Sequence, residues 1–151
     1  MRMLDLAKRG IKIAVWGNGW GSWVGKHPNL MVKNEHLYKE NYAKAINATK
    51  INLCFLRKIN RDEITSRSVE IPACGGFMLA EKTKRHLEFF KDGKEAIFFE
   101  SQDELYDLIK KYIIDDGARR KIAEAGRRRV EQGGYNHRTQ LIKMLSLIFT
   151  S

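Results

Sequence analysis

The fold of this chain is decided by one stretch, residues 51–79, which reads INLCFLRKINRDEITSRSVEIPACGGFML. Its first six residues are mostly apolar and predict a buried strand. Thr65 and Ser66 are good helix N-caps, and Pro72 must distort or end the helix that they start. The next apolar run, residues 77–80, predicts another short strand. The stretch therefore predicts a strand–helix–strand unit.

The same alternation continues toward the N-terminus. In chain order we expect a short helix, a strand, a glycine-rich loop, a second short strand and a helix, at residues 4–9, 11–16, 17–25, 30–32 and 37–48. Gly10 is a natural residue for ending the first helix. The strand at 11–16 is rich in β-branched residues, which favour a pleated and buried position.

Toward the C-terminus the sequence predicts a short strand at 96–99 and then three helices. The first helix begins at a capping box, Ser101 to Glu104, and carries an apolar stripe at helical spacing. The inner faces expected for the three helices are Leu105, Leu108, Ile109, Tyr112 and Ile113; Ile122, Ala123, Gly126 and Val130; and Leu141, Met144, Leu145 and Ile148. Strands that alternate with helices predict a single Rossmann-like α/β domain over residues 1–151, three layers thick, with a parallel sheet and helices on both faces.

Composition narrows the classes of protein that remain. The chain has 151 residues, with 28 Lys and Arg against 18 Asp and Glu, which gives a formal charge of +10. Its 43% hydrophobic content is enough for a core and argues against intrinsic disorder. Two isolated cysteines, Cys54 and Cys74, make no zinc motif and are expected to be small core residues. The charged N-terminus predicts no signal peptide, so the expected location is the cytoplasm.

Two loops follow predicted strands, where ligands of open parallel sheets bind. The first contains Gly17, Asn18 and Gly19, and its glycines let the backbone approach a phosphate, although a flexible turn explains them equally well. The second offers Thr65, Ser66 and Arg67 at a helix start, which suits a diphosphate. Glu70, one turn further on, could accept hydrogen bonds from ribose hydroxyls. A capped surface helix with a solvated acid is the alternative interpretation of this second loop.

The quoted stretch resembles the C-terminal domain of glycosyltransferases of the GT-B fold, in the branch similar to spore-maturation proteins. The run from Arg61 to Gly76 fits the pattern R-D-x-x-T-S-R-x-x-E-I-P-A-C-G-G, and its Thr-Ser-Arg and Glu-Ile-Pro-Ala-Cys-Gly-Gly blocks are the most specific part. The similarity continues through FKDGKEAIFFESQDELYDLIKKYI, IAEAGRRRV and the opening VWGNGW, so it covers nearly the whole chain. The resemblance implies that this domain binds the nucleoside diphosphate sugar that donates the glycosyl group.

Several residue roles are implied by this resemblance. An E-x7-E motif of the family corresponds here to Asp62, which would contact the sugar, and Glu70, which would contact the ribose. Thr65, Ser66 and Arg67 would meet the diphosphate, and the turn at 17–21 would face the cleft. Arg57 and Lys58 would offset the negative charge of the diphosphate; the alternative is that they are solvated charges of a surface loop. Asp62 and Arg67 are the residues expected to take part in transfer itself. The first acid is Asp, whose shorter reach differs from the family pattern.

The resemblance also implies a second, N-terminal domain that binds the acceptor, and this chain begins near the connector that follows it. We therefore expect the chain to fold alone, to bind donor and to be inactive by itself as a hexosyltransferase-like enzyme. No Asp-x-Asp motif occurs, so no metal or other cofactor is expected. The four scattered histidines have no metal-ligand spacing.

The basic runs at 119–121 and 127–129 lie on one late helix, and most of their charges are expected to be solvated. A membrane surface or a lipid-linked acceptor is a further expected partner of these runs. Two other functions remain as alternatives: a non-catalytic nucleotide-binding or adaptor module, and a basic nucleic-acid-binding domain. Known nucleic-acid-binding motifs are missing from the sequence, so no nucleic-acid partner is expected.

Overall fold

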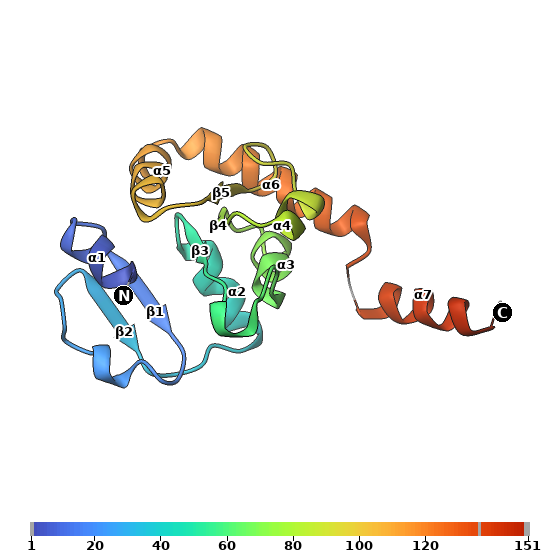
Figure 1. Ribbon diagram of the computed structural model, residues 1–151, viewed down its shortest axis with the longest axis horizontal. Coiled ribbons are helices and arrows are strands. Elements are labelled where there is room, and N and C mark those ends of the chain that lie inside the picture. Colours follow the sequence, from blue (N-terminus) through green and yellow to red (C-terminus); the bar gives the residue numbers. More distant parts are fainter. Residues whose placement is uncertain (1, 136, 150–151) are drawn as a thin grey trace. The chain divides into compact units, whose positions relative to one another are not determined.

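The computed structural model describes residues 2–135 and 137–149, and it divides into two compact units, residues 1–45 and 46–151. Every strand pairing in the described residues is parallel, and helices flank the strands (Figure 1), so the predicted Rossmann-like α/β class is confirmed. The strands form two sheets, of order β1-β2 and β3-β4-β5, where the sequence led us to expect one.

The first unit is a small two-stranded sheet with a helix. α1 (Arg2–Lys8) precedes β1 (Ile13–Trp16), and β1 pairs in parallel with β2 (Leu30–Lys33). A turn of 3-10 helix, η1 (Gly21–Trp23), lies in the glycine-rich loop between the strands. The core of the unit consists of Ala7, Val15 and Leu30 with partly buried Met3, Leu4, Ile13, Trp20 and Val32 around them. The helix and both strands fall where the sequence predicts them, and η1 lies within the predicted glycine-rich loop.

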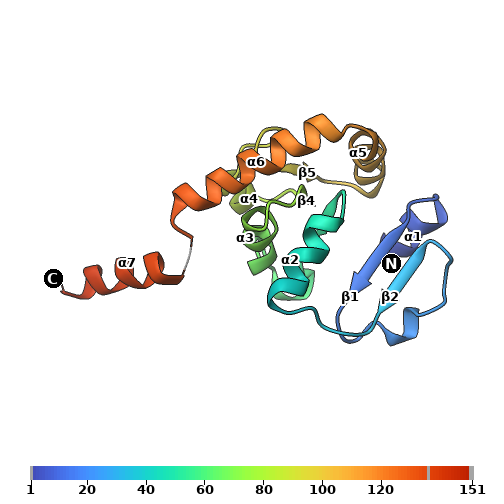
Figure 2. The same ribbon diagram turned by 180° about the vertical axis from the view of Figure 1, so that it is seen from behind.

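The second unit begins within α2 (Lys39–Ala48) and is built on the sheet β3-β4-β5. β3 (Asn52–Cys54) pairs with β4 (Met78–Glu81), which in turn pairs with β5 (Ile97–Phe99). Residues 78–80 and 97–99 are buried, so β4 and β5 form the centre of the core. Both views of the ribbon show these strands enclosed by helices of the same unit (Figures 1 and 2).

β3 is shorter than the predicted strand at 51–56 because a side chain replaces a strand partner. The backbone N–H of Leu56 donates at 3.2 Å to the side-chain oxygen Oε1 of Glu81, at the end of β4, instead of to a backbone carbonyl of that strand. The chain then turns through a short 3-10 helix, η2 (Lys58–Asn60), in the loop that the sequence predicts to be polar. β3 therefore leads directly into the loop that precedes α3 (Ser66–Ala73).

α3 ends where Pro72 and the following glycines predict. Gly75 has a φ of +77°, and its N–H donates to the carbonyl of Pro72 at 2.8 Å. The N–H of Gly76 reaches the carbonyl of Ile71 at 2.9 Å, which completes a Schellman motif. A Cβ on Gly76 would lie 2.4 Å from Cγ2 of Ile46, so this close approach also requires glycine. α3 packs against β3, β4 and α6 (Asp116–Gly133).

One helix was not predicted. α4 (Lys84–Phe89) lies between the predicted strands at 77–80 and 96–99, where the sequence predicts no element. Its N-cap is Thr83, whose hydroxyl accepts the N–H of His86 at 3.0 Å. With six residues, four of them polar or charged, α4 has too little apolar periodicity to be recognised, and the cap was its one signal in the sequence.

Three helices close the chain, as predicted: α5 (Gln102–Ile114), α6 and α7 (His137–Phe149). The predicted inner face of α6 is buried throughout, and so are Leu105, Ile109 and Tyr112 on α5. A Cβ on Gly126 would lie 2.4 Å from the carbonyl oxygen of Glu95, so α6 approaches that loop as closely as backbone permits. The predicted stripe on α7 forms a helix, but its side chains are exposed: Leu141, Met144, Leu145 and Ile148.

Candidate functional site

The first turn of α3 has the chemistry of an anion site. Thr65 is the N-cap, and its carbonyl accepts the N–H of Ser68 at 3.0 Å. The N–H groups that open an α-helix have no acceptor inside the helix, and the helix dipole favours negative charge there. Ser66 and Arg67 are exposed at this position, on the segment that follows the carboxyl end of β3. This turn can therefore offer N–H groups, a hydroxyl and a guanidinium to one ligand.

A chain of buried polar groups lies directly behind this turn. The N–H of Thr65 donates to Oγ of Ser68 at 3.2 Å, and that hydroxyl is 2.8 Å from Nε2 of His86. Nδ1 of His86 lies 2.6 Å from the carbonyl oxygen of Glu81. Ser68 and His86 are both fully buried, and Cys54 lies 3.7 Å from the Ser68 hydroxyl. The start of α3 is thus joined through side chains to the end of β4.

Burial determines the charge state of the two ionisable side chains in this hydrogen-bonded network, His86 and Cys54. It lowers the pKa of His86, although the backbone carbonyl and the carboxylate of Glu81 act in the opposite direction. Burial likewise raises the pKa of the Cys54 thiol, in spite of the hydroxyls of Ser68 and Thr65 beside it. Both side chains are therefore neutral near pH 7. The prediction that Cys54 is a small core residue is confirmed.

The loop before α3 is also held at both ends. At its start, the N–H of Leu56 is bound by Glu81, as described above. Near its end, the hydroxyl of Thr83 donates to the carbonyl of Glu63 at 2.6 Å and accepts the N–H of His86 at 3.0 Å. In between, Arg61 has a φ of +53°, in the left-handed region that residues other than glycine seldom adopt. Asp62 therefore follows a strained residue in an anchored loop.

Most of the predicted site residues lie together on this one segment of the second unit. Ser66, Arg67, Glu70 and Arg57 are exposed, and Asp62 and Thr65 are half-buried. The side chain of Lys58 lies outside the described part of the structure. Glu70 is one helical turn beyond Ser66 on α3.

Gly17, Asn18 and Gly19 belong to the first unit and are described by themselves. Gly17 has a φ of +131° and Gly19 a φ of +84°, so both need the conformational freedom of glycine. The N–H of Gly17 donates to the carbonyl of Lys33 at 3.2 Å, which continues the pairing of β1 with β2. The N–H of Trp20 donates to Oδ1 of Asn34 at 3.3 Å. The glycines thus form an ordered turn at the carboxyl end of β1.

The sequence did not identify the residues that support α3 from behind. Ser68 stands inside the motif that resembles the family but at one of its variable positions, and His86 is one of the four scattered histidines. Ser68 and His86 are 18 residues apart in the sequence, so no local spacing shows that they are hydrogen-bond partners. The only local signal was Thr83, three residues before His86, at the spacing of a helix cap.

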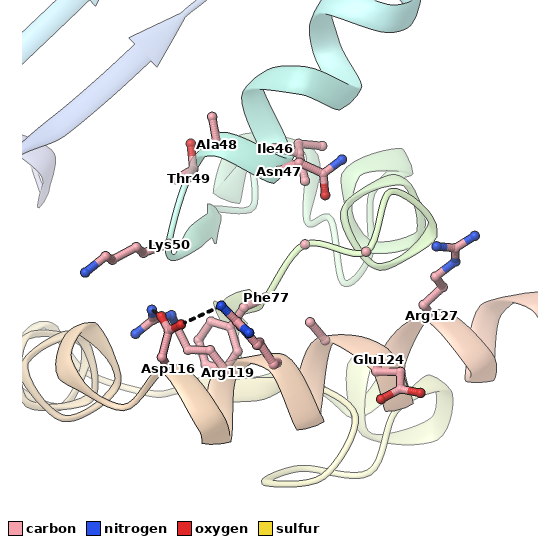
Figure 3. Close-up of a pocket in the computed structure, with 14 residues that line it drawn as sticks. Ile46, Asn47, Ala48, Thr49, Lys50, Phe77, Asp116, Arg119, Glu124 and Arg127 are labelled. Atoms are coloured by element: carbon pink, nitrogen blue, oxygen red, sulfur yellow. Dashed lines mark hydrogen bonds and ion pairs between the residues drawn. The ribbon is translucent and has the colours of Figure 1, made fainter.

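A pocket of about 490 Å³ lies at the side of the sheet where the strands begin, opposite to the start of α3 (Figure 3). Two of the residues that line it come just before strands: Phe77 directly precedes β4, and Lys50 lies two residues before β3. The pocket therefore lies where these strands begin. Ligands of open parallel sheets bind at the other edge, where strands end. The described lining includes none of the residues predicted to bind donor.

The basic runs of α6 are mostly neutralised by acids of the same helix. Arg120 pairs with Asp116 at 3.1 Å, Arg127 with Glu131 at 2.9 Å, and Arg128 with Glu124. Arg119 departs from the expectation that these charges are solvated. It is 5% exposed and donates to the carbonyl of Tyr112 and to Asp116, because the start of α6 folds back against the end of α5.

The described residues contain neither a metal-binding cluster nor a membrane-spanning helix. Within them, no three His, Cys, Asp or Glu side chains come close enough together to bind a metal ion. None of the helices in the described ranges is both long and apolar enough to cross a bilayer.

The lowered pKa of His86 predicts how stability depends on pH. The unfolded chain takes up a proton near pH 6.5, whereas the folded chain takes it up only at lower pH. The free energy of unfolding should therefore fall as the pH drops below about 6.5, by at most about 1.4 kcal/mol per pH unit from this one group. Urea unfolding at pH 5 to 8 measures it. The His86→Gln variant should lack this part of the slope, and equal slopes in the two proteins would contradict the prediction.

Comparison with known protein families identifies the family of this chain. The family model described as glycosyl transferase-like matches residues 1–144. A comparison with curated proteins found no match. Because the family model covers nearly the whole chain, the protein belongs to the glycosyl transferase-like family.

Proposed function

We propose that this chain is the donor-binding domain of a glycosyltransferase and binds a nucleoside diphosphate sugar at the start of α3. The observation that carries the proposal is the Thr65–Arg67 turn, which follows the end of a parallel strand and is fixed from behind by Ser68 and His86. An exposed N-terminal turn that is held rigidly is preorganised for the diphosphate. Family membership supports glycosyl transfer as the reaction.

In this proposal each residue has a distinct task. Ser66 and Thr65 bind the diphosphate with N–H and hydroxyl groups, and Arg67 offsets its charge as it leaves. Glu70 accepts hydrogen bonds from the ribose, and Asp62 contacts the sugar. Arg57 and the turn at Gly17, Asn18 and Gly19 complete the donor site.

The chemical contribution of this domain is electrostatic. The glycosyl group transfers as the bond to the diphosphate breaks, and the α3 dipole with Arg67 stabilises the departing diphosphate without a metal. The acceptor is held by a second, N-terminal domain, and a lipid-linked acceptor or membrane surface is its proposed environment. We further propose that the reaction takes place in the cytoplasm and that the chain alone does not turn over. Turnover by the isolated chain would contradict this last point.

Replacement of Arg67 by alanine tests the donor site. Calorimetry with UDP-, GDP- and dTDP-sugars should show binding of one of them by the unmodified chain. R67A should weaken that binding by roughly ten- to a hundredfold, because a charge-assisted contact to phosphate is lost. E70A should weaken binding of the nucleotide but not of inorganic pyrophosphate, since its contact is to the ribose.

Arg120→Ala is the matched control. It removes the same charge from an exposed position on α6, in the pocket at the opposite edge of the sheet. Binding should be unchanged in R120A. Weaker binding in R120A with unchanged binding in R67A would place the ligand in the other pocket and refute the proposed site. Salt-sensitive binding of DNA or RNA without nucleotide-sugar binding would instead favour the nucleic-acid alternative.

A further inference from the structure

The proton positions in the buried chain follow from its geometry. Nδ1 of His86 faces a carbonyl oxygen at 2.6 Å, and a carbonyl can only accept, so Nδ1 carries a hydrogen. In a neutral imidazole Nε2 is then an acceptor, and the Ser68 hydroxyl at 2.8 Å must donate to it. The lone pairs of Ser68 are left to accept the N–H of Thr65 at 3.2 Å. Three donors, Nδ1 of His86, the hydroxyl of Ser68 and the N–H of Thr65, therefore each have one acceptor, and their hydrogen bonds have one direction.

This directional chain ends at the residue that sets the start of α3. The backbone of Thr65 has the extended conformation of an N-cap, and its N–H is the group that Ser68 binds. The ring of Phe98 stacks on the imidazole with 5.3 Å between centroids and 10° between planes, so it packs against one face of the His86 ring. The hydroxyl that accepts the N–H of Thr65 is thus itself held by a side chain from α4.

We propose that Ser68 and His86 are positioning residues of the diphosphate site: acting through Thr65, they aim the first N–H groups of α3 at the phosphates. The inference rests on the proposed function. Neither side chain touches the ligand, since both are fully buried. Their effect is on the affinity for the diphosphate, through the direction of the N–H groups, rather than on the folding of the domain alone.

The test compares nucleotide affinities of the full chain and its variants, measured by calorimetry with UDP, GDP and dTDP as probes. Ser68→Ala and His86→Leu each break the series of hydrogen bonds between Thr65 and Glu81. Each should weaken nucleotide binding by roughly tenfold, which corresponds to about 1.4 kcal/mol. The double variant should bind nucleotide no more weakly than either single variant, because both substitutions act through the same hydrogen-bonded network. His86→Gln offers an amide oxygen to Ser68 and should restore most of the affinity.

Ile71→Val is the matched control for stability. Ile71 is 3% exposed on the same helix but outside the chain of hydrogen bonds. This variant should unfold more readily while its affinity, expressed per folded molecule, stays that of the unmodified chain. If S68A does not fold, S68C retains the volume with weaker hydrogen bonds and should show an intermediate loss.

The outcomes separate this inference from the function on which it rests. If the unmodified chain binds none of the three nucleotides, the proposed function and this inference both fail. If it binds one and both S68A and H86L bind equally well, only this inference fails. Nitrogen-15 NMR gives a readout without ligand: the Nδ1–H tautomer is expected for His86, and the Nε2–H tautomer would overturn the inference.

Discussion

Replacement of Phe98 by alanine is expected to lower the free energy of unfolding by about 3–5 kcal/mol. Phe98 is 3% exposed in β5, opposite Ala80 of β4, and its ring covers His86. The variant loses the burial of a whole ring and leaves a cavity in a core that has little room to collapse. Urea unfolding of the two proteins measures the difference. Phe98→Leu keeps most of the volume and should cost about 1 kcal/mol.

The same substitution has a second, more specific result. Without the ring, water can reach the imidazole, so the pKa of His86 should rise toward its ordinary value. Phe77→Ala is the matched control, because Phe77 is equally buried but contacts Tyr112 instead. It should cost similar stability and leave the pKa of His86 unchanged. An unchanged NMR titration of His86 in F98A would show that Phe98 does not shield it.

Much of this fold could be predicted from the sequence because it depends on local patterns. The buried strands β4 and β5 are short apolar runs, and their burial follows from composition alone. The inner face of α6 follows from helical period, including Gly126, where only the missing side chain allows contact with Glu95. The end of α3 follows from Pro72 and the glycines after it.

The remaining features depend on contacts between distant residues. β3 ends early because Glu81, 25 residues away, takes the N–H of Leu56. The anion-site chemistry of the Thr65 turn is visible in its residue types, but its rigidity comes from His86, on a helix too short and polar to be recognised. For the same reason, the division of the strands into two sheets has no local signal.

Arg119 is another residue whose role depends on packing. A run of three basic residues predicts solvated charges, yet its first member folds inward against the end of α5. The guanidinium can bind the carbonyl of Tyr112 and the carboxylate of Asp116 at once because its N–H groups point in fixed and different directions. The next two residues of the run, Arg120 and Lys121, are exposed.

Replacement of Arg119 by methionine is therefore expected to lower the free energy of unfolding by about 2–4 kcal/mol. Methionine keeps an apolar stem in the same place, but it leaves the carbonyl of Tyr112 without its donor and removes two charge-assisted hydrogen bonds. Urea unfolding at low and high salt is the measurement. Because the site is buried, most of the loss should remain at high salt.

Two variants show which contact of Arg119 matters. Asp116→Asn removes the ion pairs with Arg119 and Arg120 but leaves the bond to the Tyr112 carbonyl, and it should cost about 0.5–1 kcal/mol, since Asp116 is 59% exposed. Arg120→Met removes the same charge from a side chain that is 85% exposed, and it should cost less than D116N. The expected order of destabilisation is R119M, then D116N, then R120M. Equal losses in R119M and R120M would mean that the charge of α6, rather than the junction with α5, accounts for the effect.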